Sequence, residues 1–275
     1  MNKSIYIVAT PIGNLGDISF RAIEVLKTVD CILAEDTRRS RILLDHYGIK
    51  TRMLSFHKFN EQERLSKIQE LLNEYSRIAL ISDAGTPLIA DPGAALVEYA
   101  LNNKISVIPI PGASALTTLL SVSGFLTSSN RVTFTGFLSH TEYSKKREID
   151  NLINSGDTFV FFDSPNRVQK TIQIIADLDP NAEIVIGREL TKLHEEIIKF
   201  KASECPDKIS DRGEFTIAVH PDPKKANKIK LVEKNTGTRS ETKKLAVLLA
   251  NYLDLNAKDA YSLLIKLKES SSSEE

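Results

Sequence analysis

The segment ISDAGTPLIADPG, residues 81–93, constrains the fold more than any other part of the chain. It follows a short apolar run at 78–81 that is typical of a buried parallel strand, and it precedes an apolar-periodic stretch that predicts a helix. Its two glycines and two prolines favour a rigid, non-helical backbone. The loop is longer than a strand-to-helix connection needs, and ligands bind at this edge of open α/β sheets. We therefore expect a ligand site here, the alternative being an ordinary surface loop.

Strand and helix patterns alternate through the rest of the first half, which predicts right-handed βαβ units and a mostly parallel sheet. In the second half the strand patterns follow one another more closely, which favours an antiparallel or mixed sheet. A polar, basic stretch and two short helical patterns at 241–253 and 258–268 come last, with Ser240 and Asn256 as expected caps. The expected parts are an N-terminal α/β domain at 1–124, a C-terminal α/β domain at 125–221, a basic linker at 222–239, a helical extension at 240–269 and a disordered tail at 270–275.

Composition excludes several classes of protein. The 275 residues carry 36 basic and 36 acidic side chains, which is not the balance of a polybasic nucleic-acid binder. Two cysteines give neither a disulfide framework nor a CxxC pair, and the five histidines lack metal-ligand spacing, so we expect no metal. We find no signal peptide and no membrane-spanning stretch, and we expect a soluble cytoplasmic protein that contacts no membrane.

Five strand-end segments are dense in Gly, Pro, Asp, Glu and Thr, and they are expected to line one cleft because successive loops at one sheet edge converge. They are TPIGNLGD (10–17), AEDTRRS (34–40), SFHKFNE (55–61), the segment 81–93 and PIPGASA (109–115). Glycine-rich phosphate-binding signatures and a GxSxG elbow are missing. The cleft is rich in backbone donors, backbone acceptors and carboxylates, which suits a polar small molecule and favours a cation.

These motifs, in this order and spacing, closely resemble the ribosomal RNA small-subunit methyltransferase I family of the tetrapyrrole methylase superfamily. Later segments agree with the resemblance, which spans roughly residues 5–219: GFL (136–138), FFDSPNR (161–167), GRELTKLHEE (187–196) and RGEF (212–215). Ser139 stands where the family usually has proline, and Asp163 and Asn166 replace its usual glutamate and histidine. These departures concern substrate contacts of the second domain rather than the reaction.

The resemblance implies a two-domain tetrapyrrole-methylase-like fold, with an N-terminal mostly parallel sheet and a C-terminal mixed sheet. It implies S-adenosylmethionine (S-adenosyl-L-methionine) as the methyl donor, held between the two domains. The acceptor it implies is the 2'-hydroxyl of a cytidine at the decoding centre of 16S rRNA in the small ribosomal subunit. Homodimers are usual in the superfamily, so we expect a homodimer.

Residues for three roles are expected in the cleft. Candidates for the general base are Glu35, Asp36 and His57, of which Glu35 or Asp36 is favoured. Asp36 is equally well explained as a helix N-cap, and His57 is better explained as a structural histidine. The expected donor contacts are Pro11, Gly13, Asp83, Ala84, Gly85, Thr86, Pro87, Pro111, Gly112, Ala113 and Ser114. The expected substrate contacts are Thr37, Arg38, Arg39, Asn60 and Glu61, the two arginines serving RNA phosphates.

Two rival functions stay open at this point. One is a small-molecule, tetrapyrrole-type methyltransferase, although such enzymes usually carry a GxGPGD-like first loop that TPIGNLGD does not match. The other is a donor-binding ribosome-assembly factor without turnover. The C-terminal helices are expected either to clamp RNA or the ribosomal particle, or to serve dimer packing or core covering.

Overall fold

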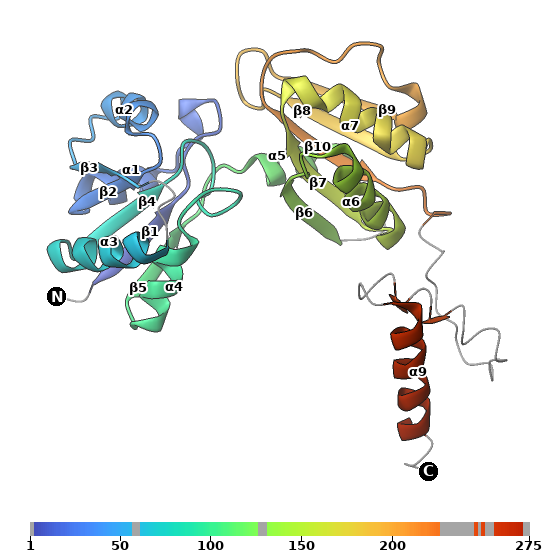
Figure 1. The fold of residues 1–275 in the computed structure, drawn as a ribbon. Helices are drawn as coiled ribbons and strands as arrows, with labels where there is room; N and C mark the ends of the chain where they lie inside the picture. The colour runs from blue at the N-terminus through green and yellow to red at the C-terminus, as the bar shows by residue number, and fades with distance from the viewer. Residues whose placement is uncertain are drawn as a thin grey trace. The chain divides into compact units, whose positions relative to one another are not determined.

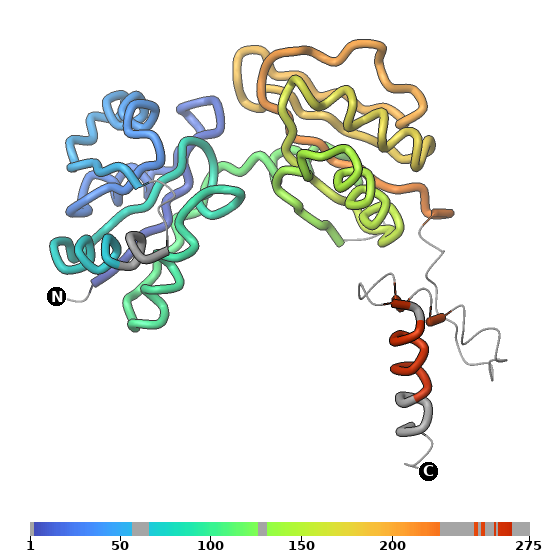
Figure 2. Tube along the Cα trace, in the orientation of Figure 1, coloured from blue at the N-terminus to red at the C-terminus, as the bar shows by residue number. Residues whose placement is uncertain are grey.

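The computed structural model describes residues 3–56, 61–125, 131–225, 245–246, 249–250 and 256–271. The chain divides into two compact units, Met1–Lys228 and Ile229–Glu275, which are described separately below. Figures 1 and 2 show the course of the chain in each unit.

The first sheet of the larger unit is entirely parallel, as the alternating pattern predicted. Its strands lie in the order β3-β2-β4-β1-β5. Their bounds are β1 Ser4–Val8, β2 Cys31–Ala34, β3 Met53–Ser55, β4 Arg77–Ile81 and β5 Ser106–Ile110. Because all five strands run the same way, the loops that follow them gather at one edge of the sheet.

Helices cover both faces of this sheet (Figure 1). Side chains that alternate along a strand point to opposite faces, so Leu33 packs with the core that α3 and α4 cover, while Ile32 packs with the core that α1 and α2 cover. The bounds are α1 Phe20–Thr28, α2 Thr37–His46, α3 Glu61–Glu74 and α4 Ala94–Asn102.

The start of α1 differs from a simple interpretation of its sequence. Asp17 can serve as an N-cap by its residue type, but it lies inside the short 3₁₀ helix η1 (Leu15–Asp17). Ser19 caps α1 instead, because its Oγ accepts a hydrogen bond of 3.1 Å from the backbone N–H of Ala22. Ser19, and not Asp17, is therefore the N-cap of α1.

The second sheet is mixed, as the closely spaced strand patterns predicted. Its order is β6-β7-β10-β8-β9, with β6 and β7 parallel and the other neighbouring pairs antiparallel. The strands are β6 Val132–Phe137, β7 Thr158–Asp163, β8 Glu183–Arg188, β9 Glu196–Lys201 and β10 Phe215–His220.

Helices also cover both faces of the second sheet. On one face lie α6 (Glu142–Ser155) and α7 (Pro165–Leu178), whose apolar side chains pack with Phe159 and Phe161 of β7. On the other lies α5 (Ala115–Ser123), which follows β5 in the chain and whose Leu119 is fully buried in the core with Val160, Val185 and Ala218. Helix α5 thus ties the end of the first sheet to the core of the second.

The smaller unit contains helix α9 (Ala257–Ser271). Asn256 caps it as predicted, because its Oδ1 accepts hydrogen bonds from the N–H groups of Lys258 (3.1 Å) and Asp259 (2.9 Å). Residues 245–246 and 249–250 are helical, while Ser240 and the rest of the expected helix 241–253 lie outside the described residues. Within the described ranges, no helix combines the length and apolar character needed to cross a membrane.

Candidate functional site

The loop between β4 and α4 is held against the loops after β1 and β5 by hydrogen bonds. Thr10 and Gly85 exchange backbone hydrogen bonds of 2.9 and 3.0 Å. Thr86 Oγ1 donates to the carbonyl of Ala113 at 3.1 Å, and Thr10 Oγ1 donates to the carbonyl of Ser82 at 3.2 Å. The convergence of these segments, predicted from their positions after parallel strands, is therefore confirmed.

The same loop holds two non-glycine residues in the left-handed region, Leu88 (φ 72°) and Ala90 (φ 71°). Each such residue costs about 1–2 kcal/mol relative to a right-handed conformation. Gly85 (φ 81°) supplies a third left-handed position without that cost. Backbone strain of this kind concentrates at ligand sites, where surrounding contacts over-determine it.

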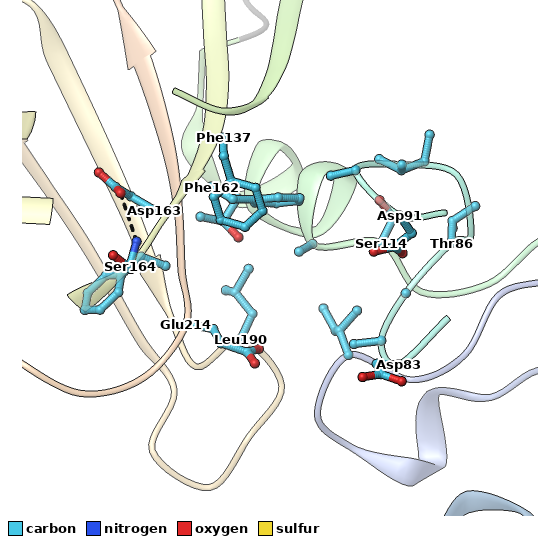
Figure 3. A pocket seen from close by; sticks show the side chains of 18 of the residues that line it. Asp83, Thr86, Asp91, Ser114, Phe137, Phe162, Asp163, Ser164, Leu190 and Glu214 are labelled. Atoms are coloured by element: carbon cyan, nitrogen blue, oxygen red, sulfur yellow. Dashed lines mark hydrogen bonds between the residues drawn. The ribbon is translucent and has the colours of Figure 1, made fainter. Parts of the chain in front are cut away.

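This loop forms one wall of a pocket of about 440 Å³, and the second sheet and its connections form the opposite wall (Figure 3). Among the described residues that line it, five bear carboxylates and one bears a guanidinium. The carboxylates are Glu35, Asp83, Asp91, Asp163 and Glu214, and the guanidinium is Arg39. Three of these carboxylates face a cation, because Asp83 pairs with Arg39, Asp163 with Arg167 and Glu214 with Lys192. The excess of negative charge is therefore smaller than the lining alone suggests, and it favours a cationic ligand over an anion. We call this chamber the large pocket.

Asp83 joins the β4 loop to the start of α2. Its Oδ1 accepts a hydrogen bond of 2.9 Å from the backbone N–H of Asp36, and its Oδ2 lies 3.4 Å from Arg39 Nη1. Both carboxylate oxygens therefore have a donor within the protein. Asp83 fixes the end of β2 beside the large pocket.

Asp36 is the N-cap of α2, as one of its two predicted roles required. Its Oδ1 accepts from the backbone N–H of Arg38 at 2.9 Å, and its Oδ2 pairs with Arg38 Nη2 at 2.9 Å. The side-chain hydrogen bond from Arg38 holds the pKa of Asp36 well below its ordinary value. A carboxylate so strongly stabilised in its charged form is a poor proton acceptor.

A buried polar network supports the opposite wall. The side chain of Asp163 is 1% exposed and accepts from the N–H of Ser164 (2.9 Å, Figure 3) and from Thr171 Oγ1 (2.6 Å). Arg167 Nε lies 3.2 Å from Asp163 Oδ1, and Lys145 Nζ donates to Thr171 Oγ1 at 3.0 Å. Burial lowers the pKa of Lys145. The network fixes the junction of β7 and α7, where Asp163 and Ser164 line the large pocket.

Two aromatic rings stand beside this network. Phe137 at the end of β6 and Phe162 near the end of β7 both line the large pocket, with ring centroids 5.7 Å apart at an interplanar angle of 63° (Figure 3). Phe137 is exposed. An exposed aromatic ring in a concave site offers a surface on which a planar ligand can stack.

The turn between β8 and β9 closes against the first loop of the chain. Lys192 Nζ bonds Glu189 Oε1 (2.9 Å) and Glu214 Oε2 (3.1 Å), and the N–H of Asn14 donates to Thr191 Oγ1 at 3.1 Å. Glu189 and Thr191 both have positive φ, 50° and 64°. This turn and the loop after β1 both line a second pocket of about 230 Å³, the small pocket.

The structure distributes the expected site residues unequally. The large pocket is lined by Glu35, Arg39, Asp83, Ala84, Gly85, Thr86 and Ser114. The small pocket is lined by Pro11, Gly13, Arg39, Asp83 and Ala84. Neither lining includes Asp36, Thr37, Arg38, Pro87, Pro111, Gly112 or Ala113. His57 and Asn60, and the side chain of Glu61, lie outside the described residues.

The sequence interpretation missed the opposite wall of the large pocket. Its residues come from motifs that had been recognised but not assigned to the site: Phe137 from GFL, Phe162, Asp163, Ser164 and Pro165 from FFDSPNR, Leu190 from GRELTKLHEE, and Gly213 to Phe215 from RGEF. The signal was the density of motifs at the strand ends of the second sheet. Across the parts of the chain that the structure describes, no three His, Cys, Asp or Glu side chains are grouped to hold a metal ion.

Comparison with known proteins agrees with this architecture. The family model described as Tetrapyrrole (Corrin/Porphyrin) Methylases matches residues 4–206. The chain belongs to the tetrapyrrole methylase family. It is therefore a methyltransferase, as its motifs predicted.

Within this family, the chain is similar to proteins named ribosomal RNA small subunit methyltransferase I. It is 43% identical to that of Thermotoga maritima over 216 residues, which cover 78% of this chain and 96% of the relative. It is 38% identical to that of Buchnera aphidicola subsp. Acyrthosiphon pisum over an alignment of 277 positions, which covers 96% of this chain and 97% of the relative.

Solved structures of tetrapyrrole methylases and related proteins share the fold. A crystal structure of diphthine synthase has a TM-score of 0.64 at 12% identity, covering 80% of this chain and 90% of the other. Uroporphyrin-III C-methyl transferase from Thermus thermophilus, complexed with S-adenyl homocysteine, has a TM-score of 0.55 at 14% identity, covering 78% and 96%. The predicted two-sheet fold is confirmed.

Proposed function

We propose that this methyltransferase transfers a methyl group from S-adenosylmethionine to a ribose 2'-hydroxyl of a cytidine in 16S rRNA. The relatives' shared name supports the RNA class. The observation that carries the proposal is the large pocket, whose described lining holds five carboxylates and one guanidinium. That excess of negative charge suits the positively charged sulfur of S-adenosylmethionine, the cofactor on which methyltransferases of this family depend.

The residues present fit the donor. Asp83, Gly85, Thr86 and Ser114 provide carboxylate, backbone and hydroxyl groups on one wall. On the opposite wall the ring of Phe137 offers a stacking surface for a purine. We assign the donor to the large pocket on this combination of negative charge, polar groups and an aromatic face.

S-adenosylmethionine supplies a methyl group that is already activated by a positively charged sulfur. Orientation of the two reactants then supplies much of the rate, up to about 7–11 kcal/mol for well-placed groups. The acceptor hydroxyl must lose its proton as the new O–C bond forms, and a positioned base contributes about 10²–10⁴-fold. We assign this base to Glu35, which lines the large pocket at the end of β2.

Asp36 is the less suitable base of the two, because its carboxylate is engaged by Arg38 and its pKa is lowered by that contact. Arg38 and Arg39 extend from the first turn of α2, and both side chains are largely exposed. We propose that they contact RNA phosphates next to the acceptor nucleotide, because such contacts dominate RNA affinity. We also propose a homodimer and, for an enzyme that modifies ribosomal RNA, a cytoplasmic location.

The test is transfer of a labelled methyl group to small ribosomal subunits that lack the modification, followed by mapping of the labelled nucleotide. Transfer to a ribose 2'-oxygen is the expected result. Transfer only to a tetrapyrrole, or donor binding without turnover, would overturn the proposal in favour of one of the two rivals.

The base assignment is tested by Glu35→Gln against the matched variant Asp36→Asn. We expect Glu35→Gln to lower kcat by at least about 10²-fold with an unchanged donor Kd. Asp36→Asn should lower stability through the weakened cap, with a smaller effect on kcat. Equal losses of kcat in the two variants would reject Glu35 as the general base.

A further inference from the structure

The small pocket lies directly beside the large pocket, to which we assigned the donor. It is built by the loop after β1, by α2 and by the turn between β8 and β9. The two chambers share the lining residues Ile12, Arg39, Asp83, Ala84 and Glu214. A group held in the small pocket is therefore separated from the donor by one common wall.

Ser40 on α2 is an unusual member of the small pocket's lining. The residue is 5% exposed, and its Oγ has no hydrogen-bond partner in the structure. A buried, unsatisfied hydroxyl costs about 1–3 kcal/mol, and alanine would be the better helix former at the same place. A hydroxyl that destabilises the folded protein is understandable if a ligand completes its hydrogen bond.

The charges of the small pocket argue against a phosphate as that ligand. Arg39 is paired with Asp83 at 3.4 Å, and Lys192 is paired with both Glu189 (2.9 Å) and Glu214 (3.1 Å). The described lining carries two cations, Arg39 and Lys192, against two carboxylates, Asp83 and Glu214, so a phosphate inside the pocket gains no net electrostatic attraction. The guanidinium of Arg39 is 68% exposed, which leaves it open to RNA phosphates outside the pocket. It does offer hydrogen-bond donors and acceptors side by side, which suits a neutral, polar ring.

Glu214 provides the acceptor side of this set. The contact with Lys192 uses Oε2, and a carboxylate can accept about four hydrogen bonds in all. Its side chain is 71% exposed, so a ligand can reach it. A carboxylate accepts hydrogen bonds from the exocyclic amine of a nucleobase, whereas it repels the carbonyl oxygen that uracil carries in place of the amine of cytosine.

We propose that the small pocket receives one nucleobase that is extruded from the RNA, a base with an exocyclic amine, and that Ser40 and Glu214 read its edge. Enzymes that act on a single nucleotide commonly take it out of the base stack into such a pocket. The Ser40 hydroxyl donates to a ring nitrogen or carbonyl of the base, and Glu214 accepts from its amine. This inference rests on the proposed RNA methyl transfer and assigns the specificity of that reaction.

The test compares methyl transfer to RNA substrates that carry cytidine, adenosine or uridine at the mapped position. We expect the wild-type protein to methylate RNA that carries cytidine or adenosine at this position with a higher kcat/KM than RNA that carries uridine. In Glu214→Gln, this difference in kcat/KM should be smaller. Ser40→Ala should lower kcat/KM for the preferred RNA about tenfold, the loss of one hydrogen bond, while donor Kd stays unchanged.

Thermal unfolding separates a reading role for Ser40 from a structural one. We expect Ser40→Ala to leave Tm unchanged or raise it, because the variant removes an unsatisfied buried group. The matched control is Ser123→Ala on α5, a buried serine that lines neither pocket and whose Oγ donates to the carbonyl of Leu120 at 3.0 Å. That control should lower Tm and leave kcat/KM intact.

If Ser40→Ala keeps the wild-type kcat/KM, Ser40 does not bind the base. If Glu214→Gln keeps the wild-type base preference, Glu214 does not bind the amine of the base. Equal transfer to uridine and cytidine by the wild-type protein would overturn the base-reading pocket while the proposed methyl transfer stands. Failure of the wild-type protein to methylate any RNA would instead overturn the proposed function, and it is seen before any variant is made.

Discussion

Gly13 leaves no room for a methyl group where the first loop meets the turn between β8 and β9. A Cβ at this position would lie 2.8 Å from both the carbonyl oxygen of Leu190 and Thr191 Oγ1, and it would overlap Lys192 Cγ. Because one of these atoms belongs to the backbone, Gly13→Ala must displace the turn and with it Leu190, which lines the large pocket.

The expected cost of Gly13→Ala combines two opposing effects. Overpacking costs about 1–3 kcal/mol, and the stiffer unfolded chain returns about 0.4–1 kcal/mol, so the net loss is about 1–2 kcal/mol. For a unit of this size, that loss lowers Tm by about 2–8 °C. Displacement of the pocket wall by about 1 Å can lower kcat/KM by up to about 10²-fold.

Thermal unfolding and methyl-transfer kinetics measure both effects. Gly16→Ala in the same loop is the matched control, because a Cβ there would meet only the side chain of Asn14. The control should keep wild-type Tm and kcat/KM. A Gly13→Ala variant with both values unchanged would refute the argument that this contact shapes the two pockets.

Three further predictions concern other parts of the chain. Asp163→Asn leaves Arg167 without its buried counterion and should lower the free energy of unfolding by about 2–4 kcal/mol, less than for a fully buried pair because Arg167 is 22% exposed; an unchanged urea midpoint would contradict this. Burial raises the pKa of Glu189, but hydrogen bonds from Lys192 and from the N–H of Glu214 outweigh it and lower that pKa overall. A carboxyl group whose pKa is lower in the folded than in the unfolded protein stabilises the fold at a pH above its unfolded-state pKa, and this stabilisation is lost as the pH falls. The difference in Tm between wild type and Glu189→Gln should therefore shrink below about pH 4.3. A constant difference from pH 7 to pH 3 would count against this. Truncation after Lys228 should preserve methyl transfer, since 78% of this chain accounts for 96% of the Thermotoga maritima relative; lost turnover in a truncated protein of normal Tm would show otherwise.

The wall that the β4 loop forms could be predicted because its signals are local. Glycines and prolines between an apolar strand and an apolar helix define the β4 loop within a few residues, and parallel strands bring such loops to one edge. Local signals fail where two candidates compete, as when Ser19 rather than Asp17 caps α1. Gly112, expected at the donor, lines neither pocket, and a Cβ added to it would lie 3.0 Å from Ala9 Cβ, so the structure gives this glycine a packing role.

The opposite wall could not be predicted because it depends on how the two sheets meet. Phe137 ends β6, Phe162 lies near the end of β7 and Glu214 directly precedes β10, and all three line the large pocket together with residues of the first sheet's loops. The hydrophobic periodicity of a strand indicates which face of its own sheet a residue occupies, but it does not indicate which part of another sheet that residue faces. Ser40 follows the same logic, since only the folded structure shows that its hydroxyl has no partner.

Helix α5 has a consequence for how this protein can be divided. Its first residue lines the large pocket, and its apolar side, including Leu116, Leu119 and Leu120, belongs to the core beneath the second sheet. A fragment that ends after α5 would carry these leucines into water, and a fragment that begins after it would uncover Val160 and Val185. We therefore expect neither α/β half to fold by itself, because a cut on either side of α5 exposes part of the second core.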